Sequence, residues 1–146
     1  MRWTVIAILL ALLSTAGQYL PAAENEPNAV LSCDGTLTPT YGETKPADPQ
    51  PIENMSVVVN LDERTVSFMG YVTRVKDVDA ATVSFGSKQI GGLDLDYSII
   101  IGGNLDRVTG HMDATTTTSD LSKQPHDPNA VVIHYDVLCK VTNRVF

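Results

Sequence analysis

Hydrophobic and polar residues alternate with a period of two along most of the chain beyond residue 54. Apolar residues occupy every second position in the segments 55–61, 66–68, 83–85, 93–101 and 131–139. This alternation is typical of β-strands that turn one face toward a core. Beyond the N-terminal region no convincing amphipathic helix is found, and residues 76–81 could form one helical turn at most. The pattern predicts an all-β domain of about seven or eight strands.

Two polar turns between these segments share the spacing Asp-x-x-Thr. The first begins at Asp62 and the second at Asp106. An aspartate at the start of a type I turn can accept hydrogen bonds from the backbone N–H groups that follow it. Gly110 closes the second turn and can adopt the left-handed backbone conformation of a hairpin bulge. We therefore expect hairpins at 55–69 and at about 97–118.

Two other segments are expected to be loops. Residues 39–53 contain Pro39, Pro46, Pro49 and Pro51, and proline neither continues a helix nor fits a central strand. Residues 119–130 are polar and also contain prolines. The four threonines at 115–118, which come just before this second loop, favour an extended backbone and predict the end of a strand.

The N-terminus has the three parts of a secretory signal peptide. Arg2 is basic, residues 3–13 are almost entirely apolar, and Ser14, Thr15, Ala16 and Gly17 are small. An apolar run of this length is shorter than the roughly 20 residues that a membrane-spanning helix needs. We expect a signal peptide at 1–17, cleaved after Ala16 or Gly17, then a flexible leader at 18–29 and a single β domain at 30–146.

The same residues are compatible with two alternatives to a cleaved signal. The apolar run could instead be a buried or interfacial helix. The residues before Cys33 also loosely resemble a bacterial lipobox, which would make Cys33 a lipid anchor. A lipobox cysteine follows its apolar run directly, however, whereas here the polar residues 24–28 intervene. We expect no stable membrane anchor after cleavage and a periplasmic or secreted protein.

The composition narrows the classes of partner. The chain has 146 residues and a formal net charge of −7, with 17 acidic and 10 basic residues. An acidic chain without a basic run is a poor ligand for nucleic acid or for an anionic membrane. Two cysteines are too few for a disulfide-dense miniprotein or a four-cysteine zinc site.

Cys33 lies in the first expected strand and Cys139 in the last. Two cysteines in an exported chain most simply form a disulfide, although two free buried thiols are the alternative. The bond would close a loop of about 105 residues and contribute roughly 4–5 kcal/mol by chain entropy. It requires the first and last strands to be neighbours or to face each other across a core. The favoured fold is therefore a small antiparallel barrel, with a β-sandwich as the alternative.

The residues that could carry chemistry are few. Two His-x-Asp pairs, His111 with Asp113 and His134 with Asp136, each share one strand face. On neighbouring strands they could assemble a zinc or copper site. The same spacing is common on solvated outer faces, so we expect surface pairs, no metal, no cofactor and no catalytic residues. The third histidine, His126, lies in the second loop, and no Gly-x-Ser-x-Gly nucleophile motif is present.

Several stretches of the chain resemble a known group of proteins. They include Cys33-Asp34-Gly35, the run 57–68, residues 80–85, residues 104–110 and residues 135–140. Together they resemble a family of uncharacterised small exported β-rich proteins of rhizobia and related soil bacteria. The resemblance covers roughly 33–146 and implies a periplasmic or secreted location, with no activity to carry over.

The sequence thus favours an exported, non-enzymatic β-module that binds either a small apolar ligand in a barrel mouth or a partner in the cell envelope. One alternative is a metal-dependent or hydrolytic enzyme that uses the His-x-Asp pairs. The other is a purely structural protein of the envelope.

Overall fold

A computed structural model of the chain describes residues 28–91, 96–123 and 127–142. The expected signal peptide, most of the leader and His126 lie outside the described residues. Eight strands and one short 3₁₀ turn are present in the described part: β1 (Asn28–Tyr41), β2 (Gln50–Asn60), β3 (Thr65–Phe68), β4 (Tyr71–Val78), β5 (Thr82–Gly91), β6 (Tyr97–Asp106), β7 (His111–Asp120), η1 (Leu121–Lys123) and β8 (Val131–Val141).

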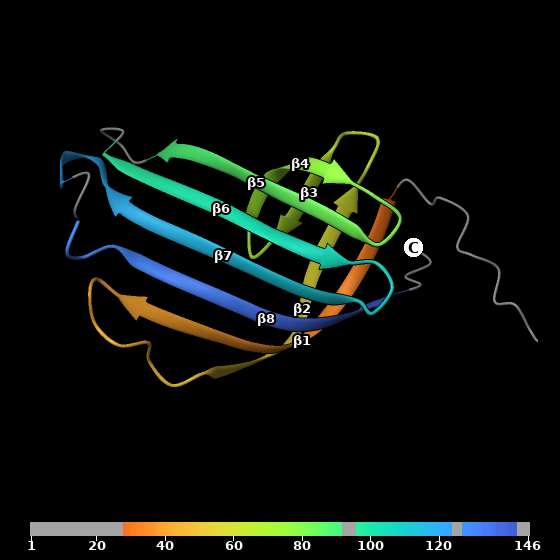
Figure 1. Cartoon of the computed structure of the whole chain (residues 1–146), viewed down its shortest axis with the longest axis horizontal. Coiled ribbons are helices and arrows are strands. Elements are labelled where there is room, and N and C mark those ends of the chain that lie inside the picture. The colour runs from red at the N-terminus through yellow and green to blue at the C-terminus, as the bar shows by residue number, and fades with distance from the viewer. Residues whose placement is uncertain (1–27, 92–95, 124–126, 143–146) are drawn as a thin grey trace, which may run out of the picture.

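The strands form a closed antiparallel barrel in which each strand pairs with its neighbours in sequence and β8 pairs with β1. The predicted barrel is confirmed, and the sandwich alternative is not the fold. In Figure 1, β5, β6, β7 and β8 run side by side, and β1 first lies along β2 and then bends to accompany β8. Both predicted hairpins are present as β2–β3 and β6–β7. No helix in the described ranges is long and apolar enough to cross a membrane.

The bend in β1 is centred on Gly35. The register between β1 and β2 shifts between Cys33 and Gly35, and the Asp34 carboxylate at the shift accepts a 2.7 Å hydrogen bond from the backbone N–H of Asn54. A Cβ atom at Gly35 would overlap the carbonyl oxygen of Asp136 on β8. Glycine here lets β1 approach β8 closely enough to close the barrel while it turns toward β2.

The apolar positions of the alternating segments point into the barrel and fill its middle. Val57, Val66, Phe85 and Met112 are all buried. The Phe68 ring makes edge contacts with three other aromatic rings, those of Tyr71, Phe85 and Tyr135. Burial raises the pKa of Tyr135, although a hydrogen bond with Thr116 opposes the shift. The barrel is therefore a packed core through its middle and not an open channel.

One strand was missing from the sequence prediction, which gave residues 76–81 at most a helical turn. Residues 71–78 instead form β4. The β4–β5 register shifts between Val75 and Asp77. This bulge moves the inward position from Val75 to Val78, so the apolar residues there are three apart and the period of two is lost.

The first proline-rich segment is only partly a loop. Pro39 belongs to β1 and pairs with Ile133, and Pro51 belongs to β2 and pairs with Thr36. Pro39 lies beyond the end of the β1–β2 ladder, and Pro51 lies before the start of the β2–β3 ladder. Each strand is an edge strand at that point, so the missing N–H breaks no ladder bond, which is where proline is tolerated.

Candidate functional site

An apolar pocket occupies one end of the barrel. At this end, on the right in Figure 1, β1 and β5 begin and β2, β6 and β8 end, and the β2–β3, β4–β5 and β6–β7 turns lie there. The cavity has a volume of about 570 Å³. We call it the mouth pocket. Eight mostly apolar residues form its wall: Ala29, Leu31, Val59, Leu61, Val83, Leu105, Cys139 and Val141.

One half of the disulfide, Cys139, lines the mouth pocket. Cys33 and Cys139 are directly opposite each other in the β1–β8 ladder and form the predicted bond. Cys33 is fully buried, and Cys139 is 6% exposed. The backbone N–H of Thr142 donates to the carbonyl of Val30, so the cysteines occupy one of the alternate, non-hydrogen-bonded pairs of the ladder, where side chains are closest. The bond fastens the barrel where its first and last strands meet.

The rim of the pocket is the turn between β6 and β7. The Asp106 carboxylate accepts hydrogen bonds from the backbone N–H groups of Val108, at 2.8 Å, and Thr109, at 2.9 Å. These bonds, with that from Thr109 the larger effect, lower the pKa of Asp106. Gly110 has a φ of 78°. Both sequence predictions for this turn, the aspartate cap and the left-handed glycine, are confirmed.

The rim is tied to the neighbouring β4–β5 turn. The backbone N–H of Arg107 donates to the carbonyl of Ala81, at 2.6 Å, and its guanidinium Nη1 donates to the carbonyl of Asp79, at 2.9 Å. The Asp79 carboxylate caps its own turn by accepting from the N–H groups of Ala81 and Thr82. Two adjacent turns therefore hold each other in place at the opening.

The β2–β3 turn differs from its prediction. The side-chain oxygen of Asn60, and not that of Asp62, accepts the backbone N–H within the turn, from Glu63 at 2.8 Å. Arg64 has a φ of 53°, in the left-handed region. The capping residue therefore lies two positions before the aspartate, and the Asp62 side chain is exposed.

The two His-x-Asp pairs do come together, on the outer face of β7 and β8. Asp113 and Asp136 are directly opposite in the ladder. His111 Nε2 lies 2.8 Å from Asp136 Oδ1, and His134 Nε2 lies 3.4 Å from Asp113 Oδ2, so the partners cross between the strands. All four side chains are between 42% and 59% exposed. They occupy the face of the sheet opposite the mouth pocket.

The four side chains of these pairs are not arranged as a metal centre in the described structure. Among the residues that the structure describes, no group of three or more His, Cys, Asp or Glu side chains is placed to hold a metal ion. Each imidazole faces one carboxylate of the other strand. The arrangement is that of two solvated ion-pair contacts, which on an open surface contribute little to stability.

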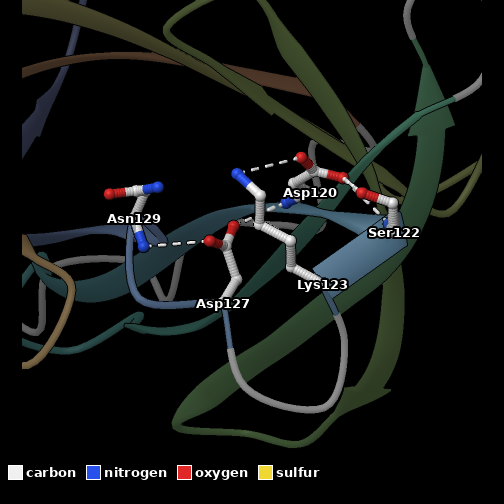
Figure 2. Close-up of polar contacts among 5 residues, drawn as sticks. All are labelled: Asp120, Ser122, Lys123, Asp127 and Asn129. Atoms are coloured by element: carbon white, nitrogen blue, oxygen red, sulfur yellow. Dashed lines mark hydrogen bonds and ion pairs between the residues drawn. The ribbon is translucent and has the colours of Figure 1, made fainter.

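A second polar cluster closes the loop between β7 and β8 at the opposite end of the barrel (Figure 2). Asp120 Oδ1 accepts from the N–H and hydroxyl of Ser122, and its Oδ2 lies 3.4 Å from Lys123 Nζ. Asp127 accepts from the backbone N–H groups of Asp120 and Asn129. Hydrogen bonding, chiefly from the Ser122 hydroxyl, lowers the pKa of Asp120. Each carboxylate oxygen of Asp120 and Asp127 therefore contacts a group of this loop or of the residue next to it.

The lining of the mouth pocket is the feature of the fold that the sequence predicts least well. A barrel mouth was expected in general terms, but its lining residues were not. They come from five strands and two turns, and only Leu61, Leu105 and Val141 signal the pocket by being apolar where a strand meets a polar segment. No protein-family model, curated protein or solved structure matches this chain, so the resemblance to small exported proteins of soil bacteria stays an expectation.

Proposed function

We propose that this protein is an exported binding module that holds a small apolar molecule in the mouth pocket and carries out no reaction on it. The observation that supports the proposal is the pocket itself, about 570 Å³ with apolar walls. Small-molecule sites are typically concave, roughly 300–1,000 Å³ in volume and mostly apolar, with a few polar groups that fix orientation. The mouth pocket has this size, and its polar groups are confined to the rim.

The pocket is built to keep its shape without a ligand. Its walls are strands of a closed sheet, its seam is joined by the Cys33–Cys139 bond, and its rim turns are capped and linked through Arg107. A preformed site loses little conformational entropy on binding. Burying apolar ligand surface there contributes about 25 cal/mol per Å².

Two features support a location outside the cytoplasm. The disulfide is consistent with an oxidising compartment, because cytosolic thiols are generally kept reduced. The N-terminal pattern of Arg2, an apolar run and small residues is that of a secretory signal. The proposed place of action is therefore the periplasm or the exterior.

A fluorescent apolar probe tests the proposal. N-phenyl-1-naphthylamine, which brightens in an apolar site, should bind the purified protein with saturation at one site. Val141→Asp places a hydrated carboxylate at the exposed edge of the wall and should weaken binding about threefold or more, because the ligand loses apolar contact there and the carboxylate loses part of its hydration. Val141 is 65% exposed, so the variant should still fold.

Leu138→Asp is the matched control. Leu138 lies on the same strand and is also exposed, but it is not in the pocket wall. The control should bind the probe as the parent does. Binding that is lost equally in both variants, or an absence of saturable binding in the parent, would overturn the proposed function.

A further inference from the structure

Acidic side chains outnumber basic ones in the three turns around the mouth pocket. The three turns that surround the opening carry four carboxylates, those of Asp62, Glu63, Asp79 and Asp106, and two guanidinium groups, those of Arg64 and Arg107. The apolar wall offers a ligand's polar group no partner, so that group must lie at the rim. The excess of negative charge therefore lies near the position of the ligand's polar group.

The two arginines are both directed toward neighbouring backbone. Arg107 donates from its Nη1 and its backbone N–H to carbonyls of the β4–β5 turn. Arg64 Nη2 lies 3.5 Å from the carbonyl of Lys76. Each guanidinium group is thus turned along the rim toward a carbonyl, which reduces its availability to an anion in the pocket.

Of these four acidic residues, Asp106 is the one that belongs to the pocket lining, at the rim. Its Oδ1 accepts both hydrogen bonds of the turn, from Val108 and Thr109. Those bonds hold the carboxylate in one orientation and favour its ionised form. The pocket therefore presents a fixed negative charge beside an apolar cavity, and a cation adjoining an apolar body is complementary to that combination.

We propose that the ligand of the mouth pocket is an apolar molecule with one cationic head, an amine or a quaternary ammonium group, held with its apolar part inside and its head beside Asp106. This inference rests on the proposed function and adds the chemical class of the ligand. A carboxylate beside the head, at the roughly 4 Å of a contact pair in water, predicts a cation preference over a neutral head of roughly fivefold at low salt, and a smaller preference at 0.15 M salt because exposed charges are screened.

Three probes with the same ten-carbon chain test the inference. Decyltrimethylammonium and decanoate, below their micelle concentrations, and decanol, below its solubility limit, are competed against N-phenyl-1-naphthylamine at low and at physiological salt. The expected order of affinity is cationic, then neutral, then anionic, with the spread reduced by salt. Asp106→Asn keeps an acceptor for the turn and removes the charge, so the preference for the cation over decanol should fall to about twofold.

Asp48→Asn is the control, because it makes the same change of net charge in the exposed loop after β1, at the other end of the barrel. It should keep the full preference. If none of the probes binds, the proposed function fails. If all three bind equally, if decanoate binds best, or if Asp48→Asn and Asp106→Asn act alike, the pocket binds apolar molecules but the inference of a cationic head is wrong.

Discussion

The carbonyl of Gly110 accepts a 2.8 Å hydrogen bond from the backbone N–H of Cys139. The rim of the mouth pocket is thereby joined to the strand that carries the disulfide. The approach is so close that a Cβ atom on Gly110 would overlap the carbonyl oxygen of Cys139. One glycine therefore couples the shape of the opening to the seam of the barrel.

Gly110→Ala should destabilise the protein by on the order of 1–3 kcal/mol from backbone strain alone, with a further cost from the overlap with Cys139. Gly70→Ala is the matched control. Gly70 has a φ of 80°, close to the 78° of Gly110, but a Cβ there has no atom within 4 Å. Both variants carry the backbone strain, so the difference between their urea midpoints measures the cost of the overlap with Cys139. Equal midpoints would show that the contact with Cys139 costs nothing.

Removing the disulfide should destabilise the fold substantially. The bond spans 106 positions, and loss of a native disulfide of this kind typically costs about 2–5 kcal/mol. The double variant Cys33→Ala/Cys139→Ala should therefore unfold at lower urea than the oxidised parent and match the reduced parent. Because both sulfurs are almost fully buried, reduction should be slow under native conditions and fast in urea. Free thiols in the natively purified protein would contradict the bond.

Much of the fold could be predicted because alternation and strand pairing report the same geometry. Val57, Val66, Phe85 and Tyr135 are all buried as the period of two required. The pairing of Cys33 with Cys139 further required the end strands to meet or to face each other. What failed was local: the β4 bulge at Val75 shifts the apolar period, and a bulge has no fixed sequence signal.

The candidate site was harder to predict than the fold. Residues two apart on a strand share a face, so His111 with Asp113 and His134 with Asp136 were paired correctly within each strand. The crossed partners depend on the register of β7 and β8, in which Asp113 faces Asp136. The mouth pocket depends on how far several strands extend past the core. The alternation within one strand does not indicate where the neighbouring strands end.

Stability should fall at acid pH through the capped turns. The pKa of Asp106 is lowered in the folded state by backbone hydrogen bonds. Its contribution is therefore present above the unfolded value of about 3.8 and is lost as pH falls through the lower folded pKa. Asp106→Asn should be less stable than the parent at pH 7, and the difference should vanish well below pH 3.8. Urea titrations at pH 7, 4 and 2.5 measure it, and a constant difference at all three would contradict the role of the ionised cap.

Export should remove the N-terminal segment. Signal peptidase requires small residues at its cleavage site, which 14–17 supply. The mature protein should therefore begin at Gly17 or Gln18. N-terminal sequencing of protein from the periplasm or medium provides the measurement, with the double variant Ala16→Glu/Gly17→Glu, which removes the small residue before both cleavage sites, as the control that should accumulate as precursor. A mature fraction that retains Trp3 would show that the apolar run is not a cleaved signal.

The crossed His–Asp pairs should behave as surface contacts with no metal affinity of note. His111 and Asp136 are 48% and 59% exposed, and an exposed pair of this kind contributes at most about 1 kcal/mol. The double variant His111→Ala/His134→Ala breaks both pairs, so its free energy of unfolding should stay within about 2 kcal/mol of the parent value. Calorimetry with zinc and copper should detect no stoichiometric binding tighter than about micromolar, which corresponds to roughly −8 kcal/mol. Tighter binding that disappears in the double variant would mean that the four side chains rearrange around an ion, and metal chemistry on this face would then be the first hypothesis. Asp48→Asn, which alters one exposed carboxylate at the far end of the barrel, should leave any such binding unchanged.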